Sequence, residues 1–416
     1  MHAPLPPSSL KEKLPLLGPG LIAAATGVGA GDLIAALVAG TNYGVAFIWA
    51  ILLGSLLKYT LNEGVGRYHL VTGQTLLQGW RTLGRWTLVY FGAYLMIWGF
   101  IYGAAGPTST ALAATAMFPQ LSLNTWAIVH SLLAFALIFL GRYQLFERVM
   151  TALTGLMFVT VVGSAVLIFP DWTKIFSGLI PNAPDGSFIF VLGLIGGVGG
   201  SITMASYGYW IKEKRWSSPA WLSVMRLDSG LAYALTAIFT LSLLIVGAEF
   251  LYGSGIVIQD EKGLITLAQM LGDKFGTPVR WLFLLGFWSA SFTSVLGVWN
   301  GVSYLFADWM RQIKREPDTT PISTTSPTYR FYVAWLTFPP MLLLFWGKPV
   351  SLVILYGVLG ALFMPFLAIT LLFLLNAKQL DAAYRNRWLT NLMLLAGVLL
   401  FVLLAAQEIW RIFSSS

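Results

Sequence analysis

The chain has 416 residues, of which 57% are hydrophobic and 10% are charged, and its formal net charge is +8. A soluble protein of this length would carry about 25% charged residues, so the composition excludes an ordinary soluble protein, and the absence of cysteine excludes disulfides and thiolate metal ligands. Repeated apolar runs of about 20 residues are typical of an all-α polytopic membrane protein, and basic loops explain the positive charge without nucleic-acid binding.

Taken in order, the apolar runs predict a flexible tail at residues 1–15 and then about eleven transmembrane helices. The predicted spans cover about 16–40, 45–66, 87–106, 124–141, 149–169, 187–211, 228–250, 281–306, 330–346, 350–375 and 389–410. We expect a transporter core at 16–375, made of repeats at about 16–169 and 187–375, with an additional C-terminal helix in 376–416. The loop 251–279 is expected to hold a short outer helix.

The distribution of basic residues predicts how these helices are oriented. With the N-terminus inside, 18 of the 25 lysines and arginines fall in inner segments. Cytoplasmic loops carry such an excess. We therefore expect a multi-pass protein of the plasma or inner membrane, with a cytoplasmic N-terminus and an outside C-terminus. The bilayer is the expected surrounding, and no obligate protein partner is implied.

Glycine clusters interrupt the first and sixth spans, at residues 27–32 and 196–200. Each glycine weakens a helix by about 1 kcal/mol relative to alanine, and backbone groups freed inside a bilayer need protein or water as partners. Interrupted helices in corresponding positions of two inverted halves indicate a transporter binding site. These two spans are five apart, which predicts a 5+5 inverted repeat with broken helices 1 and 6. For Gly27 and Gly31, close helix packing is an alternative explanation.

Asp32 is the acidic side chain placed well inside the first apolar span. An intramembrane carboxylate is a functional-site hypothesis by default, so we expect Asp32 to ligate a cation or to accept a proton. Alternatively, it caps the half-helix after the break or pairs with Lys58, the one lysine inside a span. Such a pair would disfavour a divalent cation at Asp32.

Further candidate binding residues lie around the two breaks, and further candidate gating or proton-path residues lie in other spans. Met204 could be a thioether ligand or packing filler, Asn300 could supply an oxygen ligand, and the hydroxyls of the eighth span could do the same or join helices. The predicted substrate- or ion-binding residues are Asp32, Gly29, Gly31, Gly199, Gly200, Thr203, Met204 and Asn300. The predicted gating or proton-path residues are Lys58, Glu63 and His130, although Glu63 could simply pair with Arg67 and His130 could be a satisfied core histidine.

Several motifs resemble the natural resistance-associated macrophage protein (Nramp) family of metal-ion transporters. They are Gly18-Pro19-Gly20, the glycines Gly40 and Gly44, the run from Arg67 to Gly73, and Gly141-Arg142-Tyr143 with Phe146-Glu147. The resemblance implies a leucine-transporter-like fold of eleven helices and transport of a metal ion.

The sequence departs from that family at its metal site. The family motif Asp-Pro-Gly-Asn falls on Gly29-Ala30-Gly31-Asp32, so glycine replaces its ligating aspartate and a carboxylate replaces its asparagine. The family motif Met-Pro-His falls near Thr203-Met204-Ala205, where the histidine is absent. These changes favour a hard cation such as magnesium over manganese or iron, because hard cations prefer oxygen ligands.

The residues therefore predict a secondary transporter that moves a cation by alternating access, with symport of protons as one form of coupling. A transporter of a small organic solute, such as an amino acid, is the alternative, and a non-transporting sensor is a third class. The sequence has no phosphate-binding P-loop and no enzymatic motif, so ATP is not expected to drive transport. We expect no enzyme activity and no cofactor.

Overall fold

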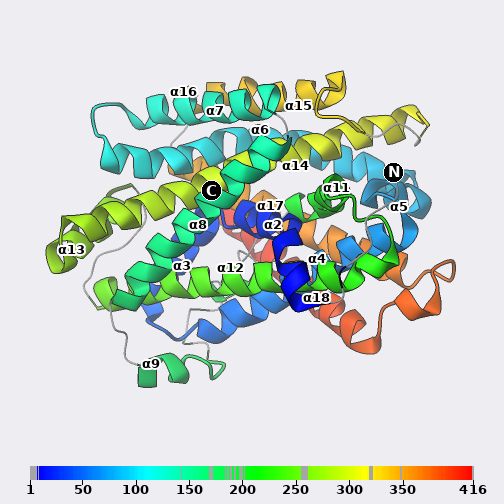
Figure 1. The fold of residues 1–416 in the computed structure, drawn as a ribbon. Helices are drawn as coiled ribbons and strands as arrows, with labels where there is room; N and C mark the ends of the chain where they lie inside the picture. The colour runs from blue at the N-terminus through cyan, green and yellow to red at the C-terminus, as the bar shows by residue number, and fades with distance from the viewer. Residues whose placement is uncertain are drawn as a thin grey trace.

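The protein is helical throughout the part that the computed structural model describes (Figure 1). The described residues are 7, 9–141, 143–167, 172–182, 184, 187, 190–191, 194–195, 200, 202–253, 261–317, 322–346 and 349–414. The α-helices are α1 (Leu10–Lys13), α2 (Pro19–Gly27), α3 (Ala30–Tyr43), α4 (Ile48–Thr72), α5 (Leu76–Leu83), α6 (Arg85–Met117), α7 (Leu123–Leu140), α8 (Tyr143–Leu167), α9 (Trp172–Ser177), α11 (Tyr207–Glu213), α12 (Leu222–Leu251), α13 (Glu261–Phe275), α14 (Thr277–Lys314), α15 (Pro327–Thr337), α16 (Leu343–Trp346), α17 (Pro349–Leu375) and α18 (Trp388–Ser414). The 3₁₀ turns are η1 (Leu14–Leu16), η2 (Ile202–Ser206), η3 (Pro219–Trp221), η4 (Pro339–Leu342) and η5 (Ala382–Tyr384).

The first predicted span is broken, as the glycine cluster predicts. Helix α2 ends at Gly27, Val28 and Gly29 lie outside any helix, and α3 begins at Ala30. Val28 has a ψ angle of 76°, which no α-helix contains. The break thus falls where two glycines flank one β-branched residue, each a weak helix former.

The sixth predicted span is also irregular. Gly200 has a φ angle of +89°, which is a left-handed conformation that favours glycine. The five residues of η2 follow, and a regular helix resumes only in α11. Residues 196–199 and 201 lie outside the described residues, so the described part of this break is Gly200 and η2.

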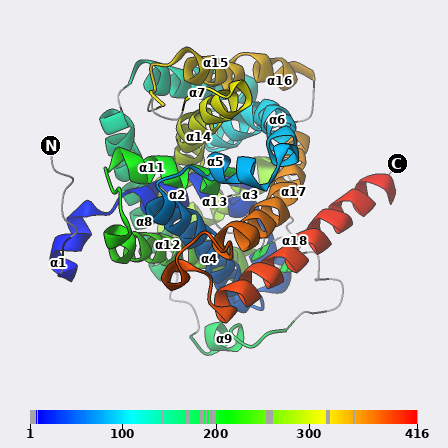
Figure 2. The same cartoon turned by 90° about the vertical axis from the view of Figure 1, so that its right-hand side faces the viewer.

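The long helices form a bundle whose two ends carry different short helices. In Figure 1, α13 lies at the left end of the bundle, α9 lies below its left half, and α5 lies at the right end. Figure 2 looks at the bundle from that right-hand side, where α2 and α4 lie inside and α18 runs along the edge. We call these the α9 end and the α5 end. Within the described residues, five helices are long and apolar enough to cross a membrane, with shorter apolar segments at 362–375 and 388–403.

The backbones of α3 and α12 approach each other through two glycines. A Cβ atom on Gly40 would overlap the carbonyl of Leu244, and a Cβ atom on Gly247 would overlap the carbonyl of Leu37. Small residues at helix interfaces permit such close packing in membranes. This interface fixes the half-helix that follows the first break against a long, continuous helix.

Several boundaries differ from those expected from the sequence. Helix α6 continues past Pro107 to Met117, and the hydroxyls of Thr108 and Ser109 bond back to the carbonyls of Ala104 and Ala105 at 2.8 and 3.0 Å. The ninth span is divided into α15, η4 and α16, because Pro339 and Pro340 have no backbone N–H to continue a helix. A helix within the loop 251–279 is confirmed as α13, and its position on the outer side of the membrane stays a prediction.

Short helices also occur where the sequence suggested only loops. Helix α5 begins with a capping box, in which Thr75 accepts a hydrogen bond from the Gln78 amide while Gln78 accepts one from the Thr75 amide. Helix α1 has the same arrangement at Ser9 and Glu12. Such helix-start signals can be recognised in a sequence. Short helices with charged ends are nevertheless missed when helices are predicted from long apolar runs.

Candidate functional site

The two interrupted segments touch each other. A Cβ atom built on Gly200 would lie 2.9 Å from the Cα atom of Gly27, the last residue of α2, and 3.1 Å from the hydroxyl oxygen of Thr203. Only glycine at position 200 allows this approach, and its positive φ angle excludes most other residues as well. We call the place where Gly27–Gly29 meets Gly200–Thr203 the junction.

Helix α14 supplies hydroxyl groups to the junction. Ser294 donates a hydrogen bond to the carbonyl of Thr26 at 2.8 Å, and Thr293 donates one to the carbonyl of Ala25 at 3.3 Å. The hydroxyl of Tyr102, in α6, lies 2.8 Å from the Ser294 hydroxyl. A helix that ends at Gly27 leaves its last carbonyls without intrahelical partners, and Ser294 satisfies that of Thr26. The single proton of the Thr293 hydroxyl is shared between the Ala25 carbonyl and the nearer Ala290 carbonyl of its own helix, at 2.9 Å. The junction is therefore lined by oxygen atoms.

Lys58 reaches the junction from α4. Its ammonium group donates a hydrogen bond to the carbonyl oxygen of Gly200. The side chain is 1% exposed, and its Nζ atom lies 5.6 Å from the centre of the Phe401 ring. The acceptor of its hydrogen bond is a backbone carbonyl of the second break. The pairing of Lys58 with Asp32 stays a prediction, because the Asp32 side chain lies outside the described residues.

Three of the predicted binding residues, Gly29, Gly200 and Thr203, lie at the junction, and a fourth, Met204, directly follows it in the chain. Gly29 faces α14, where an added Cβ atom would lie 3.0 Å from the Ser294 hydroxyl oxygen. Thr203 is buried beside Gly200, and Met204 is buried in the large hydrophobic cluster.

Other predicted residues of the breaks are described only in part. Gly31 and Asp32 lie in the first turn of α3, and the Asp32 side chain lies outside the described residues, as does Gly199. Their roles in substrate binding stay predictions.

Asn300 connects helices instead of ending in the junction. Its side-chain oxygen accepts a hydrogen bond from the Trp210 indole at 2.9 Å, and its amide nitrogen donates to the Tyr329 hydroxyl at 3.1 Å. These contacts join α14 to α11 and α15. Both polar groups of the Asn300 amide thereby have hydrogen-bond partners. If Asn300 also bound a ligand, its side-chain oxygen would have to contact the ligand and Trp210 together.

Glu63 and His130 each have specific partners. Glu63 forms ion pairs with Arg67 at 3.2 Å and with Arg226 at 2.9 Å. His130 contacts the Trp126 carbonyl through Nδ1 at 2.7 Å and accepts a hydrogen bond from the Trp288 indole through Nε2 at 2.8 Å. The histidine therefore carries its proton on Nδ1 and is neutral in this geometry. A gating or relay role for either residue stays a prediction.

The sequence analysis missed Asp228, which is fully buried near the start of α12. Its carboxylate accepts hydrogen bonds from the backbone amides of Gly18 at 2.9 Å and Gly20 at 2.5 Å, and from the Tyr207 hydroxyl at 3.0 Å. Asp228 thus holds the N-terminal end of α2 against α11 and α12. The signal in the sequence was weak, because Asp228 stands at the first position of the predicted span 228–250, whereas Asp32 lies well inside its span.

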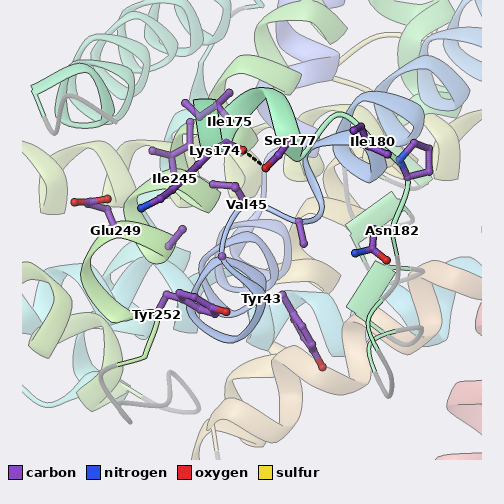
Figure 3. Close-up of a pocket in the computed structure, with 14 residues that line it drawn as sticks. Tyr43, Val45, Lys174, Ile175, Ser177, Ile180, Asn182, Ile245, Glu249 and Tyr252 are labelled. Atoms are coloured by element: carbon purple, nitrogen blue, oxygen red, sulfur yellow. Dashed lines mark hydrogen bonds between the residues drawn. The ribbon is translucent and has the colours of Figure 1, made fainter. Parts of the chain in front are cut away.

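A surface hollow of about 630 Å³ lies at the α9 end, away from the junction (Figure 3). It is bounded by Tyr43 at the end of α3, by Lys174 of α9, and by Glu249 and Tyr252 at the end of α12. None of its lining residues belongs to the junction. Within the described residues, no group of three or more His, Asp or Glu side chains could hold a metal ion.

The described residues form a helical bundle in which two interrupted segments touch at their breaks, which is the arrangement of the leucine-transporter-like fold. A crystal structure of a manganese transporter from Eremococcus coleocola has this fold at a TM-score of 0.81, with 17% identity and coverage of 99% of this chain and 90% of that one. Fold and interruptions thus agree with the class expected from the sequence.

The family model for natural resistance-associated macrophage protein-like proteins matches residues 20–411, and the chain belongs to that family of membrane transporters. It is a transport protein and not an enzyme. It is 24% identical over 328 residues to an uncharacterised protein of Pasteurella multocida, covering 76% of this chain and 75% of the relative. It is 27% identical over 285 residues to the divalent metal cation transporter MntH of Chromohalobacter salexigens, covering 64% of this chain and 65% of the relative.

Proposed function

We propose that the chain is a secondary transporter that moves a divalent metal cation through the junction by alternating access. The observation that carries the proposal is the set of oxygen atoms that α2, α14 and Gly200 place together at the two breaks. Unwound backbone carbonyls of broken helices coordinate ions in transporters of this architecture. Family membership and the name of the relative from Chromohalobacter salexigens support a divalent cation.

The donor atoms favour a hard cation such as magnesium over manganese or iron. Carbonyl and hydroxyl oxygens suit hard ions, whereas thioether sulfur and imidazole suit softer transition metals. Met204 is 1% exposed inside the hydrophobic cluster, and the sequence has no histidine between His130 and its C-terminus. Asp32, in the first turn of α3, would add one carboxylate to this set.

We include proton coupling in the proposal. A carboxylate that is expected inside the membrane can bind either a proton or a cation. Asp32 is the candidate for that exchange, because it directly follows the first break. Uptake of the cation should then depend on the pH difference across the membrane, and Asp32→Asn should remove that dependence.

Transport of a small organic solute remains the second candidate, because Lys58 places a positive charge on the Gly200 carbonyl. An ammonium group repels a nearby divalent cation and attracts a carboxylate. Amino acids offer such a carboxylate, and helix N-termini at a break add to the attraction.

Uptake into proteoliposomes distinguishes these functions. We expect saturable uptake of Mg²⁺, weaker uptake of Mn²⁺, and no uptake of amino acids. Ser294→Ala should reduce cation uptake at least tenfold, because it removes the hydroxyl that bonds to the Thr26 carbonyl. Ser303→Ala is the matched control, since this buried serine of the same helix donates its hydrogen bond to the Trp299 carbonyl of its own helix at 2.6 Å. Uptake of an amino acid without uptake of any divalent cation would overturn the proposal in favour of the second candidate.

A further inference from the structure

The buried ammonium group of Lys58 is unusual for a membrane helix. A lysine at the centre of a bilayer costs about 2.5–3.5 kcal/mol on insertion scales, and long basic side chains normally extend to the membrane surface. Lys58 instead points into the protein and is 1% exposed. Its position therefore requires a compensating interaction.

The structure brings Lys58 to the break through the packing of α4. Gly54 lies one helical turn before Lys58 on the same face, and a Cβ atom there would lie 2.8 Å from the carbonyl oxygen of Ile195. This contact places α4 directly against the first half of the interrupted segment. Lys58, four residues after Gly54 in the same helix, then reaches the Gly200 carbonyl.

Two features make the site suitable for a single positive charge. The Gly200 carbonyl belongs to non-helical backbone and accepts the Lys58 hydrogen bond. The face of Phe401, in α18, lies near Nζ at 5.6 Å, a distance at which an aromatic ring attracts a cation. A carbonyl oxygen and an aromatic face recognise alkali-metal cations as well as ammonium groups.

We propose that Lys58 is a tethered cation that occupies the place of a monovalent ion at the junction, so that the protein needs neither Na⁺ nor K⁺ to hold its broken helix together. Removing the ammonium group would leave the Gly200 carbonyl as a vacant monovalent-cation site. This inference rests on the proposed function only in treating the junction as the binding site. Which cation contacts the Gly200 carbonyl can be tested without measuring transport.

The test is thermal unfolding of the purified full-length protein in detergent, with Na⁺, K⁺ or ethylammonium exchanged for the bulky cation N-methylglucamine. The wild-type Tm should not change. Lys58→Met should lower the Tm in N-methylglucamine, and Na⁺ or ethylammonium should restore about 2–4 °C with saturation. Lys58→Arg, which retains a charge, and Lys212→Met, which alters an exposed lysine, should both remain insensitive.

Three results would overturn the inference. One is saturable stabilisation of the wild-type protein by Na⁺ or K⁺, a result that can be obtained without making any variant. The second is a folded Lys58→Met protein that responds to none of the small cations. The third is that folded Lys58→Met protein cannot be purified in any of these ions. Purification of folded protein only when a small cation is present would support the proposal. Failure of Mg²⁺ uptake in proteoliposomes would reject the proposed function and leave these Tm results unaffected.

Discussion

Asp228 shows how one side chain controls the position of a half-helix. The first amides of a helix have no intrahelical partners and carry partial positive charge. The Asp228 carboxylate accepts hydrogen bonds from two amides at the start of α2 and from Tyr207 of α11. Three elements are thereby joined at a buried point near the α5 end, and α2 cannot move away without breaking these bonds.

Replacing Asp228 should destabilise the protein strongly. Asp228→Ala leaves two buried amides and a hydroxyl without their acceptor, so we expect a loss of about 3 kcal/mol, against about 1 kcal/mol for Tyr207→Phe. Thermal unfolding in detergent measures both variants. Equal, small losses in the two variants would show that the carboxylate does not hold α2 in place.

Residue identity alone could not predict most of the contacts at the junction. Glycine runs and charges are rare inside apolar spans, which is why the sequence singled out Gly27, Gly200 and Lys58, and the structure places these three at the breaks. The role of Asp32 stays a prediction. The acceptor of Lys58 and the partners of Asn300 depend on which helices pack together. Tyr102, in an apolar run, carried no signal that its hydroxyl would meet Ser294 of a helix almost 200 residues away.

Between elements, glycines decide which helices approach closely. Gly54 of α4 and Gly155 of α8 are both helical, yet their surroundings differ. A Cβ atom on Gly54 would lie 2.8 Å from backbone oxygen of Ile195, whereas one on Gly155 would meet nothing within 4 Å. Only the first glycine is therefore required by packing.

The two glycine positions should respond oppositely to alanine. Gly54→Ala should cost about 1–3 kcal/mol by overpacking α4 against the interrupted segment. Gly155→Ala should be neutral or should stabilise by up to about 1 kcal/mol through helix propensity. Denaturation of the two purified variants compares them directly, and a stabilised Gly54→Ala protein would contradict the packing described here.

The observed helix boundaries match the predicted ones where an apolar run is interrupted by glycines. They differ from the predicted ones elsewhere. The break between α2 and α3 was predictable because its glycines flank a β-branched residue. The extension of α6 beyond Pro107 was not, because a proline inside an apolar run ordinarily ends or kinks a helix. Likewise, α9 is too short to give a periodic pattern.

At the scale of the molecule, the membrane orientation is a prediction that the absence of cysteine makes easy to test. Ser9→Cys, in the exposed N-terminal segment, and Ser177→Cys, at the exposed end of α9, introduce single thiols into a chain with none. A membrane-impermeant maleimide should label Ser177→Cys in intact cells, and Ser9→Cys only after permeabilisation, because basic loops place the N-terminus inside. The reverse labelling would contradict this orientation.

The central claim is that the two breaks together form the binding site for a cation. Mg²⁺ uptake by proteoliposomes carrying the wild-type protein, Ser294→Ala or Ser303→Ala tests it most directly. The account predicts saturable uptake that is lost in Ser294→Ala and retained in Ser303→Ala. Uptake that is equal in all three proteins would contradict it, because the cation would then cross without using the oxygen atoms of the junction.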